Sequence, residues 1–185
     1  MSQIVSLIKT NQMKYFIILI YLALFSCKSL NQDLNETFYQ ENKGINLYAF
    51  VGKKLSVIEF DPNNPRQYRI SINSTTNDTI KYDQYIMDLG FNCQYLVVKK
   101  IFNDLNTEVI EFKAYDHYGR PAFENYNYSV MYVSMKSDSS GYFHQKYQFD
   151  PVKMDKNGNW IGLNGESLEK LFKEKKEKVL KGLFD

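Results

Sequence analysis

The fold is decided by three runs, which read Phe91-Asn-Cys-Gln-Tyr-Leu-Val-Val-Lys-Lys-Ile-Phe102, Glu108-Val-Ile-Glu-Phe-Lys-Ala-Tyr-Asp-His-Tyr-Gly119 and Tyr128-Ser-Val-Met-Tyr-Val133. Each run is rich in β-branched and aromatic residues, and Asn, Asp, Gly or Pro residues separate it from the next. Such runs are typical of neighbouring strands in a β-meander. We therefore expect a mainly β fold.

Apolar side chains recur at every second position within these runs, as in strands with one buried face. Cys93 falls in this alternating set, so we expect it to be buried and inert, like a small hydrophobe. A reactive thiol and a disulfide with Cys27 are the alternatives. The predicted core residues are Phe91, Cys93, Tyr95, Val97, Ile110, Phe112, Ala114, Val130 and Tyr132.

Further strands are predicted on both sides of this stretch. Residues 46–60 form the first, and Gly52 within it indicates a bulge or bend. The long segment that follows is predicted to be an insertion that covers one end of the sheet. Near the other end of the chain, Phe143, Tyr147 and Phe149 alternate, and Pro151 is expected to end that strand. Asn157-Gly158 predicts a tight hairpin.

From Glu166 the apolar period changes from two to about 3.6, which predicts a C-terminal amphipathic helix over residues 166–183. Glu residues offset most of the Lys residues on its polar face, so we expect the helix to pack on the sheet rather than bind a membrane. The apolar positions are Leu168, Leu171, Phe172, Val179, Leu180 and Leu183.

Residues 13–27 have the order of a signal peptide, with Lys14, an apolar run and a small residue. The run is shorter than the 20 or so residues of a transmembrane helix. Leu24-Phe-Ser-Cys27 resembles a bacterial lipobox, where a signal peptidase cuts before a lipid-modified cysteine. Residues 1–26 are thus predicted to be a lipoprotein signal peptide and Cys27 the lipidation site. A buried N-terminal helix and an ordinary secretory leader are the alternatives.

Acyl chains of the palmitate type on Cys27 would anchor the protein stably in a membrane. Residues 27–44 are polar and are predicted to be a flexible tether, followed by a β domain over residues 45–185. Bacteroidota lipoproteins that reach the cell surface resemble one another in an acidic cluster after this cysteine, where this chain has only Asp33 and Glu36. We therefore expect a bacterial cell-envelope protein that is lipid-anchored in the outer membrane and faces the periplasm.

The charge balance argues against nucleic acid as a partner. Lys9 and Lys14 are the only charged residues among the first 26, so the rest of the chain has 21 basic and 21 acidic residues. Nucleic-acid-binding domains carry a basic excess or stripe. No P-loop or dinucleotide glycine motif occurs, and no cofactor is predicted. The 15 Tyr and 13 Phe residues favour strands, and core packing explains them better than a binding face.

The order of the predicted elements is similar to the netrin-like or metalloproteinase-inhibitor (TIMP-like) type of OB-fold. Phe50-Val-Gly-Lys-Lys-Leu-Ser-Val57 resembles the first strand of that group, F-x-G-x-V, with Lys54 in place of the valine. Residues 95–112 resemble its hairpin, and residues 126–133 resemble a later strand. The resemblance implies a small OB-like β-barrel with a C-terminal amphipathic helix.

The chain departs from that group in its cysteines. The group usually has paired cysteines, and its inhibitors reach zinc through a free N-terminal Cys amine, which lipidation of Cys27 would block. The fold is therefore expected to carry over and the inhibitor function is not. Residues 115–121, Tyr-Asp-His-Tyr-Gly-Arg-Pro, also resemble lipoproteins of Flavobacterium-type bacteria. That resemblance implies no activity.

Asp116, His117 and His144 are the only cluster that contains histidine, a residue that can serve as a base or a metal ligand. They could serve a metal-assisted hydrolase, although their spacing fits no known zinc frame. The alternative is that Asp116 and His117 start a turn and that His144 faces solvent together with Lys146 and Gln148. No serine stands in a nucleophile elbow.

Residues 155–166 partly resemble a calcium loop. Asp155, Asn157 and Asn159 take its first, third and fifth positions, and Glu166 takes the twelfth. Trp160 stands where the sharp turn needs glycine, so a simple hairpin turn is favoured and no metal site is predicted.

Two classes of function follow from these observations. The favoured one is a non-catalytic envelope lipoprotein that binds a protein or glycan partner, a class that includes immunity-type inhibitors of secreted toxins. The other is the metal-assisted hydrolase. The residues predicted to contact a partner are Tyr115, Asp116, His117, Tyr118 and Arg120.

Overall fold

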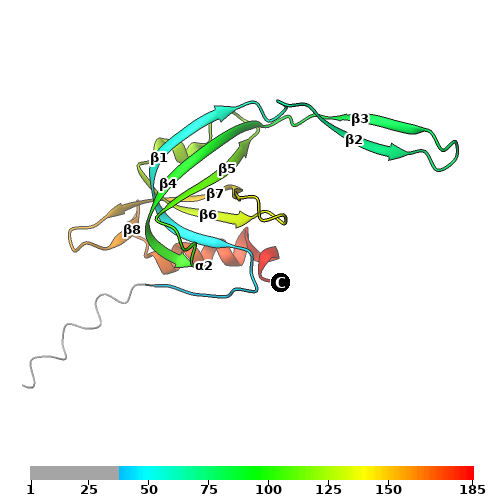
Figure 1. The fold of residues 1–185 in the computed structure, drawn as a ribbon. Coiled ribbons are helices and arrows are strands. Elements are labelled where there is room, and N and C mark those ends of the chain that lie inside the picture. The colour runs from blue at the N-terminus through cyan, green and yellow to red at the C-terminus, as the bar shows by residue number, and fades with distance from the viewer. Residues whose placement is uncertain (1–37) are drawn as a thin grey trace, which may run out of the picture. The chain divides into compact units, whose positions relative to one another are not determined.

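The computed structural model describes residues 38–185, and the predicted signal peptide and Cys27 lie outside this range. These residues form a mainly β domain with one α-helix near the C-terminus (Figure 1). In chain order, the elements are β1 (Tyr48–Phe60), β2 (Gln67–Ile72), β3 (Thr79–Gln84), β4 (Leu89–Phe102), β5 (Val109–Asp116), η2 (Ala122–Asn125), β6 (Tyr128–Met135), β7 (Tyr142–Met154), β8 (Trp160–Gly162), α2 (Leu168–Lys178) and η3 (Lys181–Leu183).

Six strands form the main sheet in the order β5-β4-β1-β6-β7-β8. The sheet curves so that β5 also pairs with β7, in parallel, through Phe112 with Tyr142 and Lys113 with Phe143. The predicted β4–β5 hairpin is confirmed, but β6 pairs with β1 and β7 rather than with β5. The simple meander was therefore wrong, because the segment with η2 carries the chain away from β5 to the far side of β1.

The strand faces predicted for β4 and β5 are confirmed. Phe91, Cys93 and Tyr95 are buried, and they pack with the buried apolar residues of β5. Burial raises the pKa of the Cys93 thiol to about 12, so the thiol stays protonated, as an inert core residue requires. Phe123 of η2 is also buried here and meets the ring of Tyr95 edge-on, with the ring centroids 6.2 Å apart. A single 3-10 turn thus contributes a central core residue.

The bulge predicted at Gly52 is present, as a register shift between β1 and β4. A Cβ atom at this position would lie 2.8 Å from Cδ1 of Tyr95 and 2.9 Å from Cε2 of Phe50. These distances are shorter than packed side chains tolerate. The close approach of the two rings therefore requires glycine here.

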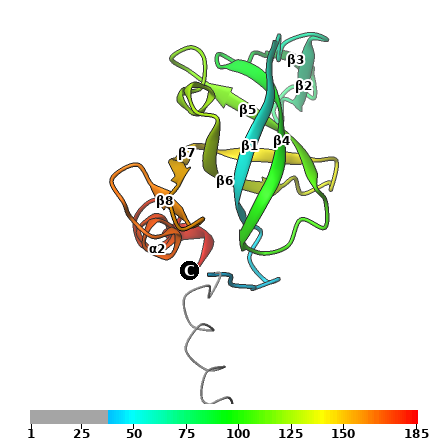
Figure 2. The same ribbon diagram turned by 90° about the vertical axis from the view of Figure 1, so that its left-hand side faces the viewer.

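The predicted C-terminal helix is confirmed as α2, with Ser167 as its N-cap. Phe172 is buried and stacks on Phe102 of β4, with the ring centroids 5.2 Å apart. The chain then continues as the short turn η3, and Figure 2 shows α2 beside β8, the last strand of the main sheet. The helix therefore closes a second core cluster, against β1, β4 and β6.

Residues 38–44, predicted to be the end of the tether, pack with the domain. The amide of Gln40 donates to the carbonyl of Ile101 (2.9 Å), and the amide of Asn103 donates to the carbonyl of Gln40 (3.0 Å). The ring of Phe38 lies 5.9 Å from that of Phe172. These contacts were missed because the polar composition of the segment hides a short strand-like pairing. Residues 27–37 of the predicted tether lie outside the described residues.

The insertion after β1 forms a separate two-stranded sheet, β2–β3, that extends away from the main sheet (Figure 1). Ile70 and Ile72 are each 68% exposed, so the hairpin does not cover an end of the sheet as predicted. Ile70 pairs with Lys81 and Ile72 pairs with Thr79 across the hairpin. These two isoleucines therefore do not pack into the core of the domain.

Strand β7 differs most from its prediction. The strand continues through Pro151, which pairs with Ser129 of β6. Proline is tolerated here because β8 pairs with β7 only from Val152 onward, so no backbone N–H of residue 151 is needed to bond to β8. His144 is buried and Tyr147 is 45% exposed, whereas the alternation predicted the reverse. A bulge in β7, described below, causes this inversion.

Candidate functional site

The turn after β5 holds the residues that were predicted to contact a partner, and two of them are structural. Tyr115 packs against Phe60, with the ring centroids 6.1 Å apart. Asp116 is buried, and its Oδ1 accepts the backbone N–H of Tyr118 at 2.9 Å. These two residues therefore shape the turn and present little surface to a partner.

Arg120 is also tied into the domain. Its Nε and Nη2 donate to the two carboxylate oxygens of Glu124 at 2.7 and 2.8 Å, and Nη2 also donates to the carbonyl of Val57 at 3.0 Å. Paired with Arg120, the carboxyl of Glu124 has a lowered pKa. Arg120 thus links η2 to β1, which is a structural use of its planar guanidinium.

His117 and Tyr118 remain accessible in this turn. Tyr118 is 87% exposed, and its ring lies 5.4 Å from that of His117. His117 Nδ1 lies 3.1 Å from Oδ1 of Asp88, the residue just before β4. Of the five predicted contact residues, Tyr118 presents most of its side chain to solvent, whereas the side chains of His117 and Arg120 are 46% and 49% exposed.

The three residues of the hydrolase hypothesis bond to different partners. Nε2 of His144 donates to the carbonyl of Gln148 at 2.7 Å, whereas Asp116 accepts from Tyr118 and His117 meets Asp88. His144 lies between the rings of Phe112 and Phe123, and burial lowers its pKa to about 4. The expectation that His144 faces solvent was wrong. Within residues 38–185, no group of three or more His, Cys, Asp or Glu side chains is placed to hold one metal ion.

The segment that resembles a calcium loop folds as the predicted hairpin turn. Oδ1 of Asp155 accepts the amides of Asn157 and Asn159, each at 2.8 Å, and Gly158 has a positive φ of 83°. Glu166 accepts the amide of Asn164 at 3.2 Å. Asp155 and Glu166 therefore each accept hydrogen bonds from residues of their own turn.

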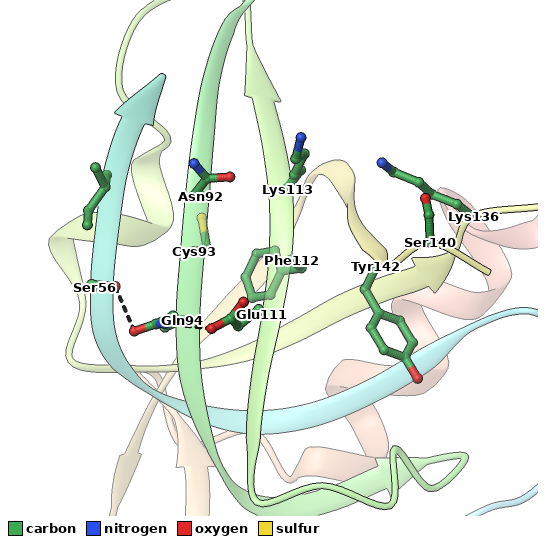
Figure 3. Close-up of a pocket in the computed structure, with 12 residues that line it drawn as sticks. Ser56, Asn92, Cys93, Gln94, Glu111, Phe112, Lys113, Lys136, Ser140 and Tyr142 are labelled. Atoms are coloured by element: carbon green, nitrogen blue, oxygen red, sulfur yellow. Dashed lines mark hydrogen bonds between the residues drawn. The ribbon is translucent and has the colours of Figure 1, made fainter. Parts of the chain in front are cut away.

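The sequence did not predict a groove of about 320 Å³ on the outer face of β1, β4 and β5. Its lining is mixed: polar outward-facing side chains alternate along the strands with buried ones, and Ile58, Cys93 and Phe112 add apolar surface. The loop between β6 and β7 forms the opposite wall, near the parallel contact of β5 with β7 (Figure 3). The outward-facing floor consists of Ser56, Ile58, Asn92, Gln94, Glu111 and Lys113, and the wall consists of Lys136, Ser140, Gly141 and Tyr142.

Hydrogen bonds order part of the groove floor. Nε2 of Gln94 donates to Glu111 at 2.7 Å, and Oε1 of Gln94 accepts from the hydroxyl of Ser56 at 3.3 Å (Figure 3). The Lys113 ammonium lies 4.9 Å from the ring centroid of Phe60. The floor thus offers amide, carboxylate and ammonium groups in fixed positions, which suits recognition of a polar ligand.

The wall of the groove is a tight turn. The amide of Lys136 donates to the carbonyl of Gly141 at 2.9 Å, and Ser139 and Gly141 both have positive φ angles. The ring of Tyr142 meets that of Tyr48 edge-on, with the centroids 5.4 Å apart. The wall is therefore held in place by backbone pairing and by an aromatic contact to β1.

No family model matches the chain, and no curated protein or solved structure is significantly similar to it. Over residues 38–185, the structure contains no helix with the length and apolar character needed to cross a membrane.

Proposed function

We propose that the protein is a bacterial envelope lipoprotein, lipid-anchored at Cys27, whose β domain acts as a non-catalytic binding module. The signal-peptide pattern and the lipobox-like Leu24-Phe-Ser-Cys27 support the anchor. The outer membrane, with the domain facing the periplasm, is the location that the sparse acidic residues after Cys27 favour.

The strand order supports an OB-like barrel of the netrin or TIMP type. Starting from β1, each strand pairs with the next in the order β1, β4, β5, β7, β6, and β6 pairs again with β1. OB-folds are five-stranded barrels that bind ligands on the face of their second and third strands and through two loops. In this scheme β4 and β5 are those strands, and residues 136–141 are one of the loops.

The observation that carries the binding proposal is the groove on this face, whose lining combines polar and apolar side chains. It lies on β4 and β5, and the β6–β7 loop forms its wall. Carboxylate and amide groups stand beside Lys113 and Lys136, so the groove suits a ligand with mixed polar groups, such as a glycan or a peptide segment. Glu111 in the floor and the balanced net charge of residues 27–185 disfavour nucleic acid.

A photo-crosslinking residue at position 94, in the acylated full-length protein within its native envelope, tests this proposal. We expect a defined adduct with one envelope glycan or protein, and we expect Lys113→Glu in the same chain to reduce it strongly. The matched control places the crosslinker at Tyr82, which is 49% exposed on β3 and remote from the groove lining. Equal adducts at both positions, or none at position 94, would contradict the groove as the binding surface.

A further inference from the structure

Strand β7 contains a bulge in which Lys146 and Tyr147 are exposed to solvent. Opposite β6, Met131 pairs with Phe149 and Val133 pairs with His144, so residues 145–148 lie across from Tyr132 alone. Tyr147 within this bulge has a φ of 65°. A bulky residue with positive φ is a genuine conformational outlier, and such strain persists where the surrounding structure holds it.

The strained backbone is held from inside the domain. Nε2 of buried His144 donates to the carbonyl of Gln148 at 2.7 Å, which closes the bulge across its base. The Lys175 ammonium of α2 lies 3.4 Å from Oε1 of Gln148. The bulge is thus tied to the domain at Gln148, while Lys146 and Tyr147 extend outward, and re-aiming side chains is a common use of bulges.

The bulge brings Lys146 and Tyr147 beside the turn that follows β5. The rings of Tyr147 and Tyr118 lie 6.2 Å apart at an angle of 32°. Asp88 joins the two segments, because its Oδ2 accepts from the Lys146 ammonium at 2.6 Å and its Oδ1 lies 3.1 Å from His117 Nδ1. The hydrogen bond from Lys146 lowers the pKa of the Asp88 carboxyl, which therefore stays ionised at neutral pH. We call the five residues Asp88, His117, Tyr118, Lys146 and Tyr147 the bulge site.

We infer that the bulge site binds a neutral sugar ring, whose C–H face stacks on Tyr118 and Tyr147 while its hydroxyls bond to Asp88, His117 and Lys146. Adjacent tyrosine rings provide an apolar platform at little cost in side-chain entropy. Sugar hydroxyls both donate and accept, and the rim of the site offers an ionised acceptor together with donor groups. Tyr118 is 87% exposed and Tyr147 is 45% exposed, and the Lys146 ammonium lies over the Tyr147 ring, 5.3 Å from its centroid.

The composition of the site separates a sugar from a nucleobase, which also stacks on tyrosine. Single-stranded nucleic acid needs a positively charged track for its phosphates, whereas Asp88 puts a carboxylate beside the rings. The bulge site also shares no residue with the groove lining. It is therefore a second site that stands or fails independently of the proposed groove.

Titration of the full-length protein in detergent micelles with maltohexaose and with the tetrasaccharide of N-acetylglucosamine, read by calorimetry, tests this inference. We expect one of these neutral oligosaccharides to bind at a single site. Tyr118→Ala and Tyr147→Gly should each weaken that binding about tenfold, because each removes half of the platform. Tyr82→Ala, which removes an exposed tyrosine from the β2–β3 hairpin, is the matched control and should leave the affinity unchanged.

Tyr147→Gly also separates binding from folding, because glycine adopts φ = 65° without strain. Its melting temperature should equal or exceed that of the wild type while its sugar affinity falls. The inference is overturned if neither oligosaccharide binds the wild-type protein. It is also overturned if both Tyr variants bind the sugar as tightly as the wild type does. Loss of binding in Lys113→Glu with retention in both Tyr variants would assign the sugar to the groove instead.

Discussion

Two of the bulges in the sheet, one at Gly52 of β1 and one at Tyr147 of β7, contain opposite kinds of residue. In β1 the bulge lies in the core, and Gly52 occupies it because any Cβ would collide with the rings of Tyr95 and Phe50. In β7 the bulge lies at the surface, where glycine would also relieve the backbone, yet Tyr147 stands there with a φ of 65°. The first bulge serves packing. The second keeps a strained residue with a half-exposed ring, which is what presentation to a ligand requires.

The largest loss of stability is expected from truncating Phe123, a core residue that contacts side chains beneath both bulges. Phe123 is buried and contacts Tyr95 beneath the β1 bulge and His144 beneath the β7 bulge, with centroid distances of 6.2 and 4.9 Å. Phe123→Ala should lower the free energy of unfolding by about 3–5 kcal/mol. Urea denaturation measures this loss. A loss below about 1 kcal/mol would mean that η2 is not part of the core linking the two bulges.

Lowering the pH should reduce the stability that His144 contributes at the β7 bulge, whereas the contacts of Gly52 at the β1 bulge should not depend on pH. The pKa of His144 falls from its usual value of 6.5 to about 4 on burial, so the unfolded chain binds the proton more readily than the folded domain. Neutral His144 makes its full contribution to the free energy of unfolding above pH 6.5. This contribution is lost as the pH falls toward 4, and the total loss is roughly 3 kcal/mol.

His144→Gln keeps a side-chain donor for the carbonyl of Gln148 and removes the titrating group. Denaturation curves of the wild type and this variant at pH 7, 5.5 and 4.5 isolate the contribution of His144. The stability difference between the two proteins should shift in favour of the variant as the pH falls. A constant difference over this range would contradict a buried, neutral His144.

A smaller loss is expected at the β1 bulge itself. Gly52→Ala places a methyl group against the rings of Tyr95 and Phe50 and should cost about 1–3 kcal/mol through overpacking. Gly182→Ala is the matched control, because a Cβ at Gly182 meets no atom within 4 Å. If both changes have the same effect on the urea midpoint, the close approach at Gly52 is not what selects glycine.

The sequence predicted the parts of the fold that depend on local periodicity. Alternation in β4 and β5 identified the buried face, and Gly52 and Asn157-Gly158 marked a bulge and a turn correctly. Features that depend on long-range pairing were missed. The order of β5 and β6 depends on η2, whose Phe123 carries no periodic signal in so short a segment.

The site was predicted only in part for the same reason. His117 and Tyr118 were named as contact residues and are exposed, but Asp116 is buried in the turn and Arg120 bonds to Glu124 and Val57. The prediction for β7 assumed that buried and exposed side chains alternate strictly along the strand. The extra residues of the bulge break this alternation, so His144 and Tyr147 were assigned to the wrong faces. The groove was missed because Gln94, Glu111 and their neighbours have the composition of an ordinary solvated strand face.

The central claim is that the β7 bulge is kept for presentation, at some cost in stability. Tyr147→Gly tests it most directly when thermal unfolding and oligosaccharide titration are measured on the same preparation. The account predicts a gain of up to about 1 kcal/mol in the free energy of unfolding, because the strain is relieved, together with sugar binding that is about tenfold weaker. A less stable variant that binds sugar as well as the wild type would contradict it.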